Sequence, residues 1–150
     1  MKTKAMACGV AALLFFLAGP AWCEDLELAA YNGEKQKVID ILKTKPDPDH
    51  RDGFGGTALH AAMFQKDTSI VVLLLDYGFD PNAKGTGNGY TPLHDAVWAS
   101  NLEAAKILLA GGADPAVRNR DGLTPYELAV KENKKQIAGY IERFAKQRHD

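Results

Sequence analysis

The sequence predicts an all-α fold, a solenoid of about four helix-turn-helix units joined by β-turn loops, from two recurring features. A four-residue motif begins at Thr57, Thr91 and Thr124, at spacings of 34 and 33 residues. Asp-Pro pairs recur at a similar spacing, at 47–48, 80–81 and 114–115, each after an apolar run. A period near 33 residues is typical of stacked arrays, in which a unit cannot bury its apolar side alone.

The amino-acid composition argues against several classes of function. The 150 residues are 46% hydrophobic and 25% charged, with a net charge of −1, which is ordinary for a globular domain. The near-neutral charge gives no electrostatic reason to expect a nucleic acid or an anionic membrane as partner. Only two serines, four histidines and two cysteines occur, so there are few ways to assemble a nucleophile, a base and an orienting group.

Residues 1–23 have the layout of a secretory signal peptide. Lys2 and Lys4 precede an apolar stretch at 5–18, which Gly19 and Pro20 end. A helix needs about 18 apolar residues to cross a bilayer, and this stretch is shorter. Its length therefore favours a cleaved signal peptide over an uncleaved membrane anchor. The mature chain is then expected to begin near Glu24 and to have no stable membrane insertion.

The repeat period divides the rest of the chain into units at about 24–52, 53–85, 86–119 and 120–144, followed by a short basic tail. The threonine that opens a motif is a favourable helix N-cap residue. The next position tolerates proline, because an N–H group there would have no partner within the helix. Thr124 and Glu127 have the spacing of a capping box, and Ser100 and Glu103 have the same spacing at the start of a second helix.

Glycine marks two predicted helix ends, Gly78 and Gly112, where a left-handed residue ends a helix. The first unit has Lys45 at this position, and Glu27 where the second and third units have histidine. The last unit replaces the leucine run with the sequence at 137–141. Both end units are therefore expected to cap the stack.

Residues 57–63 and 91–97 closely resemble the T-P-L-H-x-A-A segment of the ankyrin repeat, and 71–82 and 107–114 resemble its second helix and the G-A-D segment after it. The resemblance implies protein binding as the activity, and no cofactor. In this family the motif histidine forms hydrogen bonds between units. The residues with a structural role in the motif are Thr57, His60, Thr91, His94 and Thr124.

Three aromatic residues share one repeat position. Seven residues after the motif threonine, or after the equivalent Glu24 of the first unit, the chain has Tyr31, Phe64, Trp98 and Lys131. In ankyrin arrays this position faces a concave groove beside the loop fingers, and exposed aromatic residues are typical interface anchors. Alternatively, each ring packs over the first helix of the next unit. The predicted partner-binding residues are Tyr31, Phe54, Phe64, Gln65, Asn88, Tyr90, Asp95, Trp98, Arg118, Arg120 and Lys131.

Two other features suggest chemistry but favour a structural interpretation. The glycine-rich segment 85–89 superficially resembles a phosphate loop, yet no apolar strand precedes it and no lysine follows at the required spacing, so a longer finger is expected. His60 and His94 recur at the repeat spacing without a second ligand four residues away, which argues against a metal site. His50 and His149 are expected to be exposed and solitary.

The sequence thus predicts a monomeric, non-catalytic module that binds a partner protein through its groove and fingers, with Trp98 near the centre. A secretory signal on an ankyrin array indicates the bacterial periplasm; secretion, or tethering by an uncleaved signal, is the alternative. Within this location two roles compete, accessory factor of a periplasmic enzyme or stress-defence system, and immunity-type protein that neutralises a toxin. The rival from another class is an enzyme that uses Asp95, His94 or Glu127.

Overall fold

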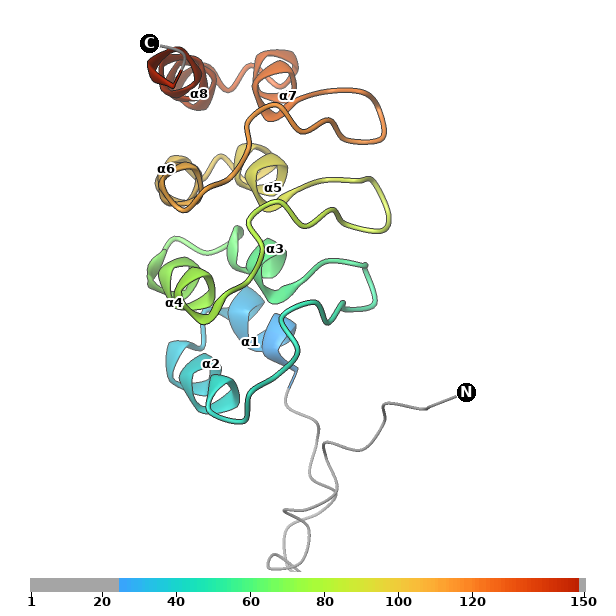
Figure 1. Ribbon diagram of the computed structural model, residues 1–150, viewed down its shortest axis with the longest axis vertical. Coiled ribbons are helices and arrows are strands. Elements are labelled where there is room, and N and C mark those ends of the chain that lie inside the picture. The colour runs from blue at the N-terminus through green and yellow to red at the C-terminus, as the bar shows by residue number, and fades with distance from the viewer. Residues whose placement is uncertain (1–24, 149–150) are drawn as a thin grey trace, which may run out of the picture.

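The computed structural model describes residues 25–148 and shows four helical hairpins stacked along one axis (Figure 1). Within this range every regular element is a helix, which confirms the predicted all-α fold. The predicted signal peptide at 1–23 and His149 lie outside the described residues. Within the described part, no helix combines the length and the apolar character needed to cross a bilayer.

The helices form two layers, because the first helices of successive units pack on one another and so do the second helices. The inner layer consists of α1 (Leu26–Asn32), α3 (Ala58–Ala62), α5 (Pro92–Trp98) and α7 (Pro125–Lys131). The outer layer consists of α2 (Lys35–Leu42), α4 (Ser69–Tyr77), α6 (Leu102–Ala110) and α8 (Lys135–Gln147). The last helix extends beyond residue 144, where the fourth unit was expected to end.

The core lies between the layers and between neighbouring units. Leu59 and Leu93 share one repeat position, Leu74 and Leu108 share another, and none of the four has exposed surface. Burying one such side chain contributes about 1.5–3 kcal/mol relative to leaving it in water. All four leucines belong to one hydrophobic cluster that runs through every unit, so each unit depends on its neighbours to bury its apolar side.

Three fingers, the loops 43–57, 78–91 and 111–124, project from the inner layer on one side of the stack (Figure 1). Neighbouring fingers are joined by backbone hydrogen bonds, from the Thr86 N–H to the Gly55 carbonyl at 3.1 Å and from the Arg120 N–H to the Asn88 carbonyl at 3.0 Å. Gly55 has a φ of 82°, and a Cβ there would lie 1.8 Å from the Thr86 hydroxyl oxygen. Glycine at this position thus permits both the turn and the contact between fingers.

The capping predictions are partly confirmed. The N–H of Thr124 donates to Glu127 Oε2 at 2.8 Å, and the Glu127 N–H donates to Thr124 Oγ1 at 3.2 Å, which is the predicted capping box. The predicted cap at Ser100 is wrong, because Ser100 has a φ of 58° and belongs to the end of α5. Asn101 caps α6 instead, and its Oδ1 accepts the N–H of Ala104 at 3.1 Å.

Left-handed residues end the second helices at the predicted positions. Gly78 has a φ of 108° and Gly112 a φ of 96°. Lys45, the equivalent residue of the first unit, has a φ of 56°, although its side chain disfavours this conformation. The fold therefore imposes the same backbone turn on all three sites. Of the three, only Lys45 has a side chain that is strained by it.

Candidate functional site

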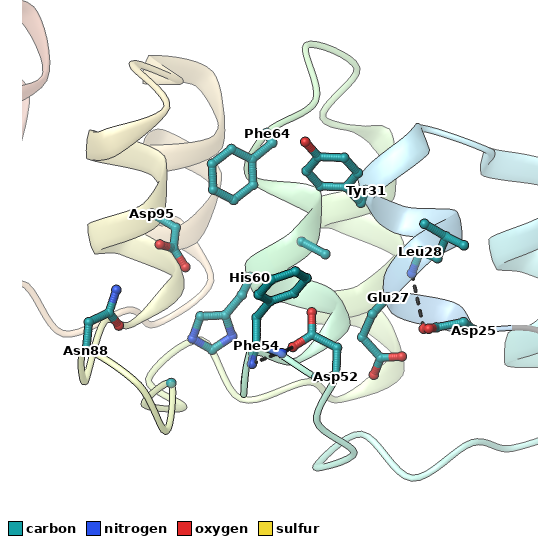
Figure 2. Close-up of a pocket in the computed structure, with 14 residues that line it drawn as sticks. Asp25, Glu27, Leu28, Tyr31, Asp52, Phe54, His60, Phe64, Asn88 and Asp95 are labelled. Carbon is teal, nitrogen blue, oxygen red and sulfur yellow. Dashed lines mark hydrogen bonds between the residues drawn. The ribbon is translucent and has the colours of Figure 1, made fainter.

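The site is a groove between the inner helices and the fingers, composed of two pockets that share Phe64, Asn88 and Asp95. The larger pocket, of about 610 Å³, lies over α1 and α3, and the smaller, of about 260 Å³, lies beside α5. Figure 2 shows Asp95 on one side of the larger pocket, and Asp25 and Glu27 on the other. We call this whole surface the groove.

The three aromatic residues at the shared repeat position line the groove and remain exposed. Tyr31 is 52% exposed, Phe64 45% and Trp98 53%. The rings of Tyr31 and Phe64 lie side by side, with centroids 5.9 Å apart, and Trp98 lines the smaller pocket with Phe64. Tyr31 thus packs against Phe64 of the next unit, as the alternative interpretation expects, but about half of the surface of each of the three residues remains exposed. Binding through the rings stays a prediction.

Phe54 adds a fourth exposed ring, at the tip of the first finger. Its side chain is 93% exposed, and it lines the larger pocket (Figure 2). The finger is held by Asp52, whose Oδ1 accepts the N–H groups of Phe54 at 2.9 Å and Gly56 at 3.0 Å. A large apolar side chain on a braced loop has few intramolecular contacts to stabilise it, which is typical of a binding surface.

Asp95 is the charged group at the junction of the two pockets. It lies half-buried on α5, one residue after the buried His94 and three before Trp98. Within residues 25–148, no hydrogen bond or ion pair reaches its carboxylate. Burial without a compensating cation raises the pKa of Asp95 to about 7, because desolvation disfavours the charged form.

The other acids of the groove have partners within the chain. Asp25 caps α1, since its Oδ1 accepts the Leu28 N–H at 3.2 Å, and Asp52 braces the first finger. Glu27 is buried, and its Oε1 lies 3.0 Å from His50 Nδ1. This bond raises the pKa of His50, whereas burial raises the pKa of Glu27. The expectation that His50 is solitary is therefore wrong, because the first finger carries it to α1.

The motif histidines join neighbouring units and do not face the groove with a free nitrogen. The N–H of Thr91 donates to His94 Nδ1 at 3.2 Å, so that nitrogen is an acceptor and the proton lies on Nε2. His94 Nε2 then donates to the Leu123 carbonyl at 3.0 Å, and His60 Nε2 likewise to the Tyr90 carbonyl at 3.1 Å. Burial lowers the pKa of both histidines. The hydrogen bonds between units confirm the expected role.

These hydrogen bonds argue against the alternative hypothesis that the protein is an enzyme in which His94 and Asp95 act on a substrate. Both ring nitrogens of His94 are engaged, and the side chain has no exposed surface. A general base must reach the proton it removes, so His94 cannot serve a substrate in the groove. Its pairing with Asp95 is not formed, because adjacent helix residues point in different directions.

Several predicted partner-binding residues lie outside the two pockets. Gln65 donates to the Tyr31 carbonyl and so joins the first two units. Arg118 bonds Glu127 Oε2 at 2.8 Å, and Arg120 donates to the Thr86 carbonyl at 2.6 Å, so both arginines brace the third finger. Lys131 is exposed at the end of α7 and lines neither pocket. The structure thus gives three of these residues a bracing role that the sequence did not indicate.

Tyr90 lines the smaller pocket but also stacks on His94, with ring centroids 5.3 Å apart. Sequence reasoning missed the acidic end of the larger pocket, which Asp25, Glu27 and Asp52 form. Glu27 shares the repeat position of His60, so its place beside the groove was accessible from the repeat spacing. The position of Asp52 depends on the path of a finger, which the repeat spacing does not indicate.

The glycine-rich segment 85–89 is an extended finger. The Gly85 N–H bonds the Tyr90 carbonyl at 2.7 Å, and the Gly89 N–H bonds the Gly85 carbonyl at 3.1 Å. In the other fingers the matching bond closes one residue earlier, from Asp52 to Gly56 at 2.9 Å and from Asn119 to Leu123 at 2.9 Å. The extra residue therefore lengthens the second finger, and the N–H groups of Gly85, Thr86 and Gly89 are used within the chain. Among residues 25–148, no cluster of three His, Cys, Asp or Glu side chains could hold a metal ion.

Stacked helical hairpins with a groove beside projecting fingers define a helical repeat protein with a binding surface. Residues 26–119 match a profile of three ankyrin repeats, so the chain belongs to the ankyrin repeat family. Human BCL-6 corepressor-like protein 1 is 39% identical over 113 residues, 75% of this chain and 6% of that protein. Human cyclin-dependent kinase 4 inhibitor B is 31% identical over 118 residues, 79% of this chain and 85% of that protein.

A third relative, protein phosphatase 1 regulatory subunit 12A of Rattus norvegicus, is 36% identical over 95 residues, 63% of this chain and 9% of that protein. This chain therefore spans a small part of the corepressor-like protein and of the phosphatase subunit, and most of the kinase inhibitor. Ankyrin repeats are generally protein interaction modules, and the names of two relatives describe an inhibitor and a regulatory subunit.

Proposed function

We propose that this protein binds a partner protein through the groove, without catalysing a reaction. The observation that carries the proposal is the row of Tyr31, Phe64 and Trp98, which line one groove while about half of each side chain remains exposed. Aromatic anchors of this kind each contribute about 2 kcal/mol or more to binding when a partner covers them. The ankyrin family and the two regulatory relatives support the same function.

Double replacement of Phe64 and Trp98 by alanine tests this proposal. Both side chains are exposed and the leucine core is untouched, so we expect the helical circular dichroism to stay unchanged. A partner that co-purifies with the wild-type chain from an envelope extract should be lost. The matched control is Tyr126→Ala, which removes an exposed ring outside the groove and should retain the partner. Equal recovery with the double variant would contradict the proposal.

We further propose that the chain acts in a bacterial periplasm after cleavage near Glu24. The support is the sequence pattern of residues 1–23, a basic start followed by a short apolar stretch. N-terminal sequencing of the protein recovered from cell fractions tests this location. A start near Glu24 in the periplasmic fraction is the expected result, and a start at Met1 in the cytoplasm would overturn it.

Within that location, the proposed role is accessory factor of a periplasmic enzyme or stress-defence system. The alternative role is an immunity-type protein that blocks a delivered toxin, and the groove suits both. The two roles predict different outcomes when the partner is assayed with the purified chain. An accessory factor should maintain or raise the activity of its enzyme, whereas an immunity protein should abolish the activity of its toxin.

A further inference from the structure

The smaller pocket of the groove combines a carboxylate with aromatic walls. It is lined by Phe64, Asn88, Tyr90, Asp95 and Trp98 and measures about 260 Å³. This volume is below the roughly 300–1,000 Å³ of typical small-molecule sites, so the pocket suits one side chain of a partner better than a free ligand. The larger pocket continues from it and offers space for the neighbouring residues of the same segment.

The charge of the lining indicates which side chain fits. The two pockets together are lined by four carboxylates, Asp25, Glu27, Asp52 and Asp95, and by no lysine or arginine. Three of these carboxylates have hydrogen-bonding partners within the chain. Asp95 differs from them, because within the described residues its carboxylate accepts no hydrogen bond. A half-buried carboxylate in this state lacks the cation that would compensate its desolvation.

The aromatic walls distinguish between the two basic side chains. Phe64 and Trp98 line the pocket with Asp95 and leave about half of their surface exposed. A guanidinium group is planar, stacks on aromatic faces and donates two parallel hydrogen bonds to one carboxylate. A lysine ammonium is a strongly hydrated point charge and matches such walls less well.

We propose, on the basis of the binding function above, that the groove holds a partner segment with an arginine whose guanidinium pairs with Asp95 and stacks on Phe64 or Trp98. Positive charge on the segment complements the acidic lining of both pockets. The raised pKa of Asp95 agrees with a site that a cation completes, since a bound guanidinium would lower that pKa again.

Peptide selection tests this assignment without a known partner. A displayed library of random 12-residue peptides is selected on the full chain and counter-selected on the Phe64→Ala/Trp98→Ala variant, so that only peptides that need the groove remain. We expect these peptides to share an arginine. Replacing that arginine by the neutral isostere citrulline should weaken binding to the wild-type chain at least tenfold, as measured by fluorescence anisotropy of labelled peptides.

A double-mutant cycle identifies the acceptor of the guanidinium. In Asp95→Asn, the arginine and citrulline peptides should bind with nearly equal affinity, because the carboxylate that separates them is gone. The matched control is Asp76→Asn, a replaced carboxylate on α4 outside the groove, which should retain the tenfold preference. Replacement of the arginine by lysine should weaken binding several-fold.

The outcomes separate this inference from the proposed function. Groove-dependent peptides that lack arginine, or that carry lysine in its place, would overturn the arginine assignment and leave the binding function intact. The same holds if citrulline weakens binding to Asp95→Asn as much as it weakens binding to the wild-type chain. Failure to recover any peptide that depends on Phe64 and Trp98 would count against both the assignment and the groove as a binding site.

Discussion

His94 Nε2 lies 3.0 Å from the carbonyl oxygen of Leu123, a residue of the next unit 29 positions away. The same ring accepts the N–H of Thr91 through Nδ1, at 3.2 Å. One side chain thereby begins helix α5 and holds the third finger against it. His60 makes the equivalent bond to the Tyr90 carbonyl, so the histidine at this motif position joins the second and third units each to the unit that follows.

Replacing His94 with alanine should therefore lower the free energy of unfolding by about 2–4 kcal/mol, since two buried hydrogen bonds and the volume of the ring are lost. Urea denaturation followed by circular dichroism measures this change. Asp76→Ala on the exposed face of α4 serves as the control, and we expect it to change stability by less than about 0.5 kcal/mol. A similar effect for both variants would contradict the role of His94.

Asp95→Asn should stabilise the fold at alkaline pH. The pKa of Asp95 is raised from its ordinary value of 3.8 to about 7, so the folded state binds more protons than the unfolded state between these pH values. The free energy of unfolding that this group contributes therefore falls as the pH rises through that window. After allowance for its partial exposure, the variant should gain about 2 kcal/mol at pH 8 and nothing at pH 3.5.

The comparison with the wild-type chain at each pH isolates Asp95 from the motif histidines. Burial lowers the pKa of His60 and His94, so their contribution is complete above the ordinary value of 6.5 and is lost as the pH falls below it. Both proteins share this loss. Urea midpoints across pH 4–8 that run parallel for wild type and variant would show that Asp95 titrates normally.

Asn101→Ala should destabilise the fold far more than Ser100→Ala. The Asn101 side chain caps α6, and its Nδ2 donates to the Met63 carbonyl at 2.9 Å and to the Gln65 carbonyl at 2.7 Å in the preceding unit. The loss of the cap and of two bonds between units should cost about 2–3 kcal/mol. Within the described residues the Ser100 hydroxyl accepts one exposed bond, from Lys134 Nζ, so thermal unfolding of Ser100→Ala should stay close to wild type.

Lys45→Gly should raise the free energy of unfolding by about 0.5–1 kcal/mol, because a residue with a φ of 56° is relieved of its side-chain strain. The matched control is Lys43→Gly, which places glycine at a right-handed position two residues earlier and should destabilise the chain. Thermal denaturation ranks the three proteins. A loss of stability in Lys45→Gly would show that the left-handed turn costs nothing here.

The sequence predicted the features that depend on the repeat period. The four units, the buried leucines and the shared face of Tyr31, Phe64 and Trp98 follow from one spacing, because residues that share a position in stacked identical units share a direction. The capping box of Thr124 and Glu127 was predictable for a different reason, since its two partners lie within one helical turn.

Only the tertiary structure decided where the polar side chains find their partners. Glu27 meets His50, and Arg120 meets the Thr86 carbonyl, because finger paths bring together residues 23 and 34 positions apart. Asn101 and not Ser100 caps α6, because Ser100 is taken up by the left-handed turn that ends α5. The sequence predicted that Asp95 lies in the groove, but only the tertiary structure shows that no cation of the described residues pairs with it. Hydrogen bonds have short reach, so their pairing is set by positions in space that a repeat period alone does not specify.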